Sequence, residues 1–399
     1  MKVLVISHMY PSTFNEIEGI FVHQQVKELR RQGWDVKVIS PMPWAPFPIK
    51  YSSKKWKHYA EVPAKSIYEG VEVYYPRFLQ FPKSLFFASS GKRMYWGIRK
   101  LVDALYQDFK FDVIHAHVAL PDGFAGMMVR RKYNKPMVVT IHGADLHVTV
   151  YRSAACRKAL SKVFKEADKV VTVSNKVQRL AEANFGSLDK LIVITNGINP
   201  AAIASKSRDL ISRYAGSKII LSVSHVIASK GLGLNIRAIS QLTGKYPDLK
   251  YVVIGAGPEI NSLRRLAYDL NLERQVDFLG ELPHNKAMEY MSIADIFSLP
   301  SWREGFGIVY LEAMAHGKPV IACEGEGISD VIEHGETGLL AKPKDVESLA
   351  QAMDFLLGNP EKARKIGERA RKLVLENYTW EENARKYMEI YRELVATHG

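Results

Sequence analysis

The chain has 399 residues, of which 47% are hydrophobic and 24% are charged, a balance typical of a globular protein with about two or three domains. Its formal net charge of +13 requires an anionic partner or a well-solvated basic surface. No run of about 18 apolar residues is present, which excludes a transmembrane helix, and the apolar run at the start is too short for a signal peptide. The two cysteines, Cys156 and Cys323, are far apart and form no Cys-x-x-Cys motif, so we expect reduced thiols in a cytoplasmic protein.

The first half of the chain alternates short apolar runs with amphipathic segments. The apolar runs predict strands at Val3–Ser7, Val36–Ile39, Val71–Tyr75, Val113–Ala116, Met137–Ile141, Val170–Val173 and Leu191–Ile194. Apolar residues on one face predict helices at Gly19–Arg31 and Lys92–Phe109. Uninterrupted Val and Ile runs separated by helices indicate a parallel sheet covered on both faces.

The stretch Pro41–Lys110 is irregular, and Val71–Tyr75 is the only strand that its pattern predicts. It carries 12 Lys and Arg residues against 5 Asp and Glu residues, interleaved with Trp44, Phe47, Tyr51, Trp56, Tyr59, Phe78, Phe81, Phe86, Phe87, Tyr95 and Trp96. Basic and aromatic residues together suit peripheral contact with an anionic membrane or with a phosphorylated acceptor. The alternative is a solvated basic face over a local aromatic core. No nucleic-acid-binding motif accompanies the charge, so we expect no nucleic-acid partner.

The strand–helix alternation begins afresh after a small, polar segment at residues 201–216. Its apolar runs predict strands at Ile219–Val223, Tyr251–Ile254, Val276–Leu279, Ile296–Leu299 and Val320–Ala322. The last segment, Lys362–Thr397, reads as two helices broken near Asn377 and Tyr378. The sequence therefore predicts two tandem Rossmann-like, doubly wound α/β domains, at residues 1–200 and 201–376, that face a cleft. A helix at residues 377–399 is expected to cross back and dock on the first domain.

Two carboxylates, Glu304 and Glu312, flank a glycine-broken loop and the start of a helix. Glycines at 305 and 307 let backbone N–H groups approach a ligand, and a helix N-terminus favours a phosphate or a polyhydroxyl group. A carboxylate pair at this spacing is common by chance. Here, however, Pro-Ser precedes the loop, Gly-Phe-Gly lies inside it, and Glu-Ala-Met-Ala-x-Gly-x-Pro-Val follows it.

This frame resembles the donor-binding motif of retaining glycosyltransferases of family 4, which have the GT-B fold with two Rossmann-like domains. Companion motifs follow in the same order over nearly the whole chain. The resemblance implies that Glu304 lies beside the donor sugar and that Glu312 accepts hydrogen bonds from the ribose hydroxyls. It also implies that the backbone of Gly305, Phe306, Gly307 and Ile308 meets the sugar and the diphosphate.

A second motif, Ser222–Gly231, ends the first predicted strand of the second half. A cation at this position neutralises a leaving diphosphate. In the family this segment usually carries Gly-Arg and then Lys-Gly. Lys230 and Gly231 match, whereas Ser224 and His225 replace Gly-Arg. We expect Lys230 to contact the diphosphate, and a contact from His225 is weaker because an imidazole is not permanently charged near neutral pH.

Three further segments resemble the nucleotide-binding parts of the family. The resemblance places Gly257, in a tight strand-to-helix turn, near the nucleotide, and Leu279 along the base. Gly19, between the first strand and the first helix, matches the N-terminal glycine loop near the donor phosphate or the acceptor. Alternatively, Gly19 only forms the turn between the strand and the helix and has no role in binding.

Polar residues also follow the strands of the first half. His142 belongs to a segment that matches the family's His-Gly-x-Asp motif, which implies contact with the donor sugar and makes Asp145 a candidate for the acceptor side. His117 and Asp122 are further candidate acceptor contacts. His115 and His117 suggest a metal pair, but we expect a strand to point them to opposite faces, which prevents them from sharing an ion.

No Asp-x-Asp motif occurs in the chain, and the family is metal-independent, so we expect no metal and no cofactor. The resemblance implies retaining transfer of a hexosyl unit from a UDP- or GDP-sugar to a hydroxyl of a glycan or polyprenyl-diphosphate-linked acceptor. The segments Met9–Ser12, Gly19–Gln25 and Pro41–Trp44 resemble those of bacterial teichuronic-acid and capsular polysaccharide glycosyltransferases. Such an enzyme is expected in the cytoplasm, at the inner face of the membrane. The alternatives are a nucleotide-sugar 2-epimerase of the same fold and a non-catalytic nucleotide-sugar-binding protein.

Overall fold

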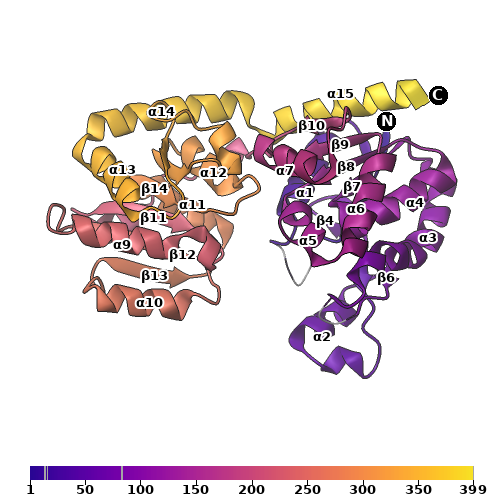
Figure 1. Cartoon of the computed structure of the whole chain (residues 1–399), viewed down its shortest axis with the longest axis horizontal. Coiled ribbons are helices and arrows are strands. Elements are labelled where there is room, and N and C mark those ends of the chain that lie inside the picture. Colours follow the sequence, from indigo (N-terminus) through magenta and orange to yellow (C-terminus); the bar gives the residue numbers. More distant parts are fainter. Residues whose placement is uncertain (13–14, 16, 82–83, 399) are drawn as a thin grey trace. The chain divides into compact units, whose positions relative to one another are not determined.

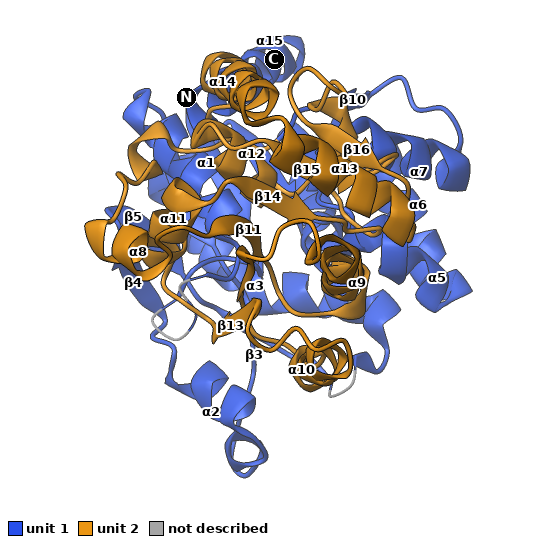
Figure 2. Cartoon of the chain, turned by 90° about the vertical axis from the view of Figure 1, so that its left-hand side faces the viewer, with its two compact units in different colours: residues 1–195, 380–399 blue, residues 196–379 orange. Residues whose placement is uncertain are grey.

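The computed structural model describes residues 1–12, 15, 17–81 and 84–398 (Figure 1). Lys83 of the basic stretch and Gly399 of the helix expected at residues 377–399 lie outside the described residues. The chain divides into two compact units, coloured separately in Figure 2: residues 1–195 with 380–399, and residues 196–379. The boundary lies after residue 195, whereas the sequence placed it after residue 200, and the last segment joins the first unit from residue 380.

The first unit is built on an eight-stranded sheet in the order β10-β9-β8-β7-β1-β2-β5-β4. All neighbouring strands are parallel except β4 and β5. The bounds are β1 (Lys2–Ile6), β2 (Asp35–Ile39), β4 (Lys65–Tyr68), β5 (Val71–Tyr74), β7 (Val113–His117), β8 (Met137–Ile141), β9 (Lys169–Thr172) and β10 (Leu191–Val193). Each strand predicted for this half is confirmed, because the Val and Ile runs supply side chains that are buried on both faces of the central strands.

The helices of the first unit follow the strands in alternation (Figure 1). They are α1 (Ile20–Arg31), α2 (Lys54–Glu61), α3 (Ser90–Phe109), α4 (Phe124–Tyr133), α5 (Val150–Arg152), α6 (Ala154–Glu166), α7 (Asn175–Phe185) and α15 (Trp380–His398). Two π-helical segments, η4 (Ala119–Gly123) and η5 (Asp145–Thr149), follow β7 and β8.

The prediction of a single strand within Pro41–Lys110 is wrong, because β4 pairs antiparallel with β5, and short strands β3 (Met42–Pro43) and β6 (Arg77–Phe78) pair with each other. The two-residue turn between β4 and β5 has positive φ at Glu69 (44°) and Gly70 (79°), as a tight hairpin turn requires. No residue of the edge strand β4 is buried, so its sequence carries no apolar run to detect.

Helix α15 packs into the core of the first unit with β1 and α1 through the stripe Ala384, Tyr387, Met388, Tyr391 and Leu394. These positions recur every three or four residues, as an amphipathic helix requires. Each large apolar side chain that is fully buried contributes about 1.5–3 kcal/mol, so the stripe anchors the chain end firmly. Polar contacts fix the register, with Gln25 Nε2 donating to Asn383 Oδ1 at 2.9 Å.

The second unit has a six-stranded, fully parallel sheet in the order β13-β12-β11-β14-β15-β16. Its strands are β11 (Lys218–Val223), β12 (Leu249–Ile254), β13 (Val276–Gly280), β14 (Ile296–Leu299), β15 (Val320–Cys323) and β16 (Leu339–Ala341). Its helices are α8 (Arg208–Arg213), α9 (Leu232–Leu242), α10 (Ile260–Asp269), α11 (His284–Ile293), α12 (Ile308–Ala315), α13 (Val346–Gly358) and α14 (Pro360–Asn377). Because parallel strands end at one edge, the loops after β11, β12, β13, β14 and β15 gather there, and such an edge is where doubly wound sheets bind ligands.

Candidate active site

The loop between β14 and α12 is held in one conformation by buried contacts. Phe306 is buried, and the Tyr310 hydroxyl donates to the carbonyl oxygen of Leu299. Gly307 precedes α12 with φ of 91°, and a Cβ on it would lie 2.6 Å from the Tyr310 ring. Glycine is therefore required at position 307, and the first turn of α12, from Ile308, presents backbone N–H groups that have no partner within the helix.

Lys230 and Glu304 form an ion pair between Nζ and Oε2 that joins the loop after β11 to the loop after β14. Both side chains are mostly buried, with 19% and 15% of their surface exposed. The backbone of the two loops is also tied, since Trp302 N donates to the Ser229 carbonyl at 3.0 Å. The Glu304 N–H donates to Glu326 Oε2 at 2.7 Å. The structure thus brings together the two residues that the sequence proposed as partners on a sugar diphosphate.

Glu312 lies on α12 and receives a hydrogen bond from His284 at the start of α11, with 2.7 Å between Nε2 and Oε1. This hydrogen bond and the carboxylate charge raise the pKa of His284 above its usual value against a smaller effect of burial. Glu312 is 21% exposed, which leaves part of the carboxylate open to a ligand. His284 was not identified from the sequence.

The remaining donor-side candidates lie on the neighbouring strand ends. His225 is exposed after β11, and Leu279 is partly exposed in β13. Gly257 packs so closely on Val226 that a Cβ would lie 2.2 Å from the Val226 carbonyl oxygen. Gly257 therefore shapes the turn after β12, and any contact with a nucleotide from it would come from its backbone.

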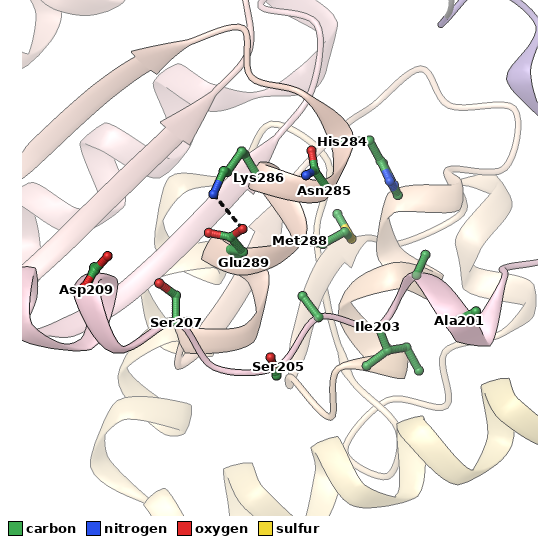
Figure 3. A pocket seen from close by; sticks show the side chains of 12 residues that line it. Ala201, Ile203, Ser205, Ser207, Asp209, His284, Asn285, Lys286, Met288 and Glu289 are labelled. Atoms are coloured by element: carbon green, nitrogen blue, oxygen red, sulfur yellow. Dashed lines mark hydrogen bonds and ion pairs between the residues drawn. The ribbon is translucent and has the colours of Figure 1, made fainter.

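A pocket of about 560 Å³ lies between the segment after residue 200 and α11 in the second unit. Figure 3 shows His284 and Met288 at its wall, and Lys286 paired with Glu289. None of the residues proposed from the sequence lines it. His284 connects this pocket to the proposed site, because it also contacts Glu312.

In the first unit, His142 follows β8 and is partly exposed, and its Nε2 lies 3.1 Å from His117 Nδ1. The Phe21 ring packs on His142 with 4.5 Å between ring centroids. Burial lowers the pKa of His142 to about 3, so the imidazole is neutral and offers a hydrogen bond, not a charge. Gly19 precedes α1 with φ of 71°, and a Cβ on it would lie 2.2 Å from the Met9 carbonyl oxygen, so glycine is required there for close packing.

The expectation that His115 and His117 point to opposite faces is wrong. Residues two apart on a strand share a face, and the two rings lie 4.2 Å apart. His115 is buried and fully engaged, with Nε2 at 2.8 Å from Thr140 Oγ1 and Nδ1 at 2.6 Å from the Tyr391 hydroxyl. Within the described residues, no group of three or more His, Cys, Asp or Glu side chains is arranged to hold a metal ion.

Asp122 in η4 and Asp145 in η5 are both buried carboxylates. Asp145 accepts from the backbone N–H groups of Ala119 at 3.0 Å and Leu120 at 3.3 Å, so it fixes the segment that carries Asp122. Burial raises the pKa of Asp145 to about 7 against these two hydrogen bonds. Asp122 accepts from the backbone N–H of His8 at 3.1 Å, and its Oδ2 lies 2.8 Å from His8 Nδ1. Contact of Asp122, Asp145 or His117 with an acceptor stays a prediction.

Three residues of the two strand edges were missed by the sequence reasoning: His8, His284 and Glu326. His8 lies two residues after the end of β1, so it shares the strand edge with His117 and His142, and position alone could have identified it. His284 and Glu326 carry no comparable signal, because their roles depend on how α11 and the loop after β15 pack.

Solved structures of the GT-B fold align with this chain over nearly its whole length, and this chain has that fold. Sucrose-phosphate synthase from Thermosynechococcus elongatus aligns with a TM-score of 0.81 over 100% of both chains at 23% identity. HepE of Anabaena, solved in complex with UDP, aligns with a TM-score of 0.76 over 98% of this chain and 100% of that chain at 19% identity.

The chain belongs to the glycosyltransferases, because a model described as Glycosyltransferase Family 4 matches residues 19–202 and one described as Glycosyl transferases group 1 matches residues 204–373. A putative teichuronic acid biosynthesis glycosyltransferase of Bacillus subtilis is 29% identical over 88% of each chain. A GDP-mannose-dependent phosphatidylinositol monomannoside mannosyltransferase of Mycolicibacterium smegmatis is 27% identical over 84% of this chain and 88% of its own. The predicted enzyme class and family are confirmed, and they favour transfer over an epimerase or a non-catalytic binding protein.

Proposed function

We propose that this enzyme transfers a hexosyl unit from a nucleoside diphosphate sugar to a hydroxyl of a glycan or lipid-linked acceptor, with retention of configuration and without a metal ion. The observation that carries the proposal is the ion pair of Lys230 and Glu304 beside the N-terminus of α12. One cation, a helix N-terminus and a carboxylate that contacts sugar hydroxyls are the groups that a sugar diphosphate requires.

The diphosphate is expected to bind Lys230 and the backbone N–H groups at Gly307 and Ile308. Phosphate oxygens would then compete with Glu304 for the Lys230 ammonium group, which frees the carboxylate to accept hydrogen bonds from the sugar. Glu312 would accept hydrogen bonds from the ribose, exchanging part of its contact with His284. The names of similar proteins support either a GDP-sugar or a UDP-sugar as donor, since one relative depends on GDP-mannose and one solved structure contains UDP.

In the proposed reaction the acceptor oxygen bonds to the anomeric carbon from the side on which the diphosphate leaves. The bond between the anomeric carbon and the phosphate oxygen breaks, and its electron pair stays on the nucleoside diphosphate. The acceptor hydroxyl's proton passes to that phosphate oxygen, so no protein base is needed. Lys230 and the loop amides stabilise the charge on the leaving group, the task that a metal ion performs in other transferases.

The acceptor is proposed to be a cell-surface glycan or its polyprenyl-diphosphate-linked precursor. The name of the Bacillus relative supports a polysaccharide acceptor, and that of the Mycolicibacterium relative supports a lipid-linked one. No helix within the described ranges is long and apolar enough to cross a bilayer. The first unit nevertheless exposes large aromatic side chains within its basic stretch, namely Trp44, Phe47, Tyr51, Phe86 and Trp96.

These exposed aromatics support peripheral contact with an anionic membrane. An aromatic core under a basic face would bury them, yet Phe47 is 79% exposed and Phe86 is 72% exposed. Helix α2, at the lower end of the first unit in Figure 1, adds Lys54, Lys55 and Lys57. Aromatic rings at the headgroup level and lysines near anionic lipid both favour such contact.

Incubation with radiolabelled UDP- and GDP-sugars and a bacterial membrane lipid extract tests the proposal. Label that enters lipid or polymer, with activity retained in EDTA, is the expected result. A strict Mg²⁺ requirement contradicts the metal-free mechanism. A changed sugar epimer without transfer, or binding without turnover, contradicts the transfer itself.

A further inference from the structure

His8 lies at the end of β1, and its imidazole is anchored on one side by a fully buried carboxylate. Asp122 has no exposed side-chain surface, whereas 35% of the His8 side chain is exposed. Oδ2 of Asp122 lies 2.8 Å from His8 Nδ1 and accepts from the His8 backbone N–H at 3.1 Å. The segment that carries Asp122 is itself fixed by Asp145 through the Ala119 N–H.

This arrangement selects one tautomer of His8. Burial raises the pKa of Asp122 above its usual value, and the charge and hydrogen bonds of His8 act in the opposite direction. When Asp122 is ionised it only accepts hydrogen bonds, so Nδ1 of His8 carries the proton. In the neutral imidazole the lone pair then lies on Nε2. Because the Nδ1 side faces a buried group, the exposed part of the ring carries Nε2, so His8 presents a hydrogen-bond acceptor to the solution.

Two polar groups at the same strand edge as His8 favour a ligand that carries hydroxyl groups. Asp122 Oδ1 and His117 Nε2 are buried and have no hydrogen-bond partner among the described residues. Buried polar atoms are almost always paired, so such atoms at a strand edge indicate places for a ligand or an ordered water. Both the carboxylate oxygen and an imidazole lone pair accept hydrogen bonds, and hydroxyl groups donate them.

We infer that His8 is an acceptor-binding residue whose Nε2 accepts a hydrogen bond from a hydroxyl of the glycan acceptor, and that Asp122 is the positioning residue that fixes its tautomer. This inference rests on the proposed function. A neutral, polyhydroxyl part of the acceptor is then expected to bind at the carboxyl ends of the strands of the first unit. An anionic group would instead require protonated His8.

The pH dependence separates these two ligand chemistries. Burial lowers the pKa of His8, but the charge and hydrogen bond of Asp122, with smaller effects of Glu18 and Asp145, bring the net pKa above its usual value. As the pH falls through this pKa, Nε2 gains a proton and loses its lone pair. If His8 binds a hydroxyl, wild-type enzyme should need more lipid extract for half-saturation at acid pH than at neutral pH. If His8 binds an anion, it should need less extract at acid pH.

The tautomer is tested by NMR of the full chain with ¹⁵N-labelled histidine. Wild type should show His8 with the proton on Nδ1, and Asp122→Asn should move it to Nε2, because an amide can donate to Nδ1. In that variant we expect about tenfold or greater loss of transfer to the lipid extract at limiting extract. His8→Ala should lose as much, and His8→Gln should recover part, because its amide oxygen reaches the region of Nε2.

A matched control is Glu69→Gln, which alters another histidine–carboxylate contact of the same unit, between His23 Nε2 and Glu69 Oε2 at 3.4 Å. This control should keep wild-type transfer. A proton on Nε2 of wild-type His8, or unchanged transfer by Asp122→Asn despite the switched tautomer, overturns the inference.

Binding of labelled UDP- or GDP-sugar without any acceptor distinguishes a failure of the His8 assignment from a failure of the proposed function. If the inference holds, the His8 and Asp122 variants bind the donor as wild type does. If wild type neither binds nor transfers any of the sugars, the proposed function fails, and His8 loses its role with it.

Discussion

The ammonium group of Lys230 and the carboxylate of Glu304 form an ion pair although the two residues are 74 positions apart in the chain. They meet because β14 lies beside β11 in the sheet, so the loops after these strands are neighbours. Both groups are largely shielded from water, so the attraction of Lys230 for Glu304, or for a bound phosphate, is stronger than it would be in bulk water.

Replacing Lys230 by Ala should lower kcat by about 100-fold or more, since the leaving diphosphate loses the cation that the proposal assigns to it. The assay is transfer of label at saturating donor. Lys245→Ala is the matched control, because Lys245 forms an exposed pair with Asp354 at 2.7 Å in the same unit. Wild-type kcat in Lys230→Ala would show that the diphosphate is stabilised elsewhere.

His284→Ala should change donor binding and leave kcat nearly unaltered. His284 holds Glu312 through a hydrogen bond of 2.7 Å, and its loss should change the donor KM by about two- to tenfold, the range of one hydrogen bond. Glu312→Gln should raise the donor KM further, because an amide accepts ribose hydrogen bonds less well than a carboxylate. A fall in kcat with unchanged KM in either variant would contradict the assignment of Glu312 to the ribose.

The buried His115 should make the first unit sensitive to acid. Burial, with a smaller effect of His142, lowers its pKa to about 3, whereas an unfolded histidine titrates near its usual value of about 6.5. Between these values the unfolded chain binds more protons, so the stabilising effect of a neutral His115 is present above pH of about 6.5 and is lost as the pH falls toward 3.

Urea unfolding at several pH values measures this effect. His115→Gln should be less stable than wild type at pH 7, since it disturbs the contacts with Thr140 and Tyr391, but should lose less stability between pH 7 and 5. Parallel loss of stability in the two proteins would contradict the buried neutral state of His115.

The exposed aromatics should mediate membrane contact. Liposomes with anionic lipid should sediment the protein at low salt and release it at high salt, because screening weakens the attraction. Replacing Phe47, Phe86 and Trp96 together by Ser should lower binding at low salt about tenfold without a change in Tm. Tyr268→Ser removes an aromatic that is 67% exposed in the second unit and serves as control. Equal binding by the triple variant and the control would exclude an aromatic anchor.

The sheets were predictable because their strands are nearly continuous Val and Ile runs. The bounds predicted for β8 are those observed, Met137–Ile141, because every residue of that strand is buried. Edge strand β4 was not predictable, since its side chains alternate between exposed and partly buried positions. The turn that forms its hairpin uses Glu69 and Gly70 in place of a recognisable Asn-Gly pair.

The candidate site was predictable residue by residue but not contact by contact. The motif around Glu304 and the match at Lys230 placed each at a strand end, yet their contact depends on strand order. The same holds for His8 and Asp122, which meet because β1 lies beside β7. The sequence alone does not predict such contacts, because the two partners are distant in the chain and their segments match different motifs.

The most direct test of the central claim compares label transfer by wild type and Glu304→Gln, with a nucleotide sugar that wild type uses. The substitution keeps the size of the side chain and removes the charge that pairs with Lys230, so folding is expected to be intact and Tm checks this. We predict that Glu304→Gln binds the nucleoside diphosphate but transfers sugar at least about 100-fold more slowly. Transfer at the wild-type rate would contradict the account of this site.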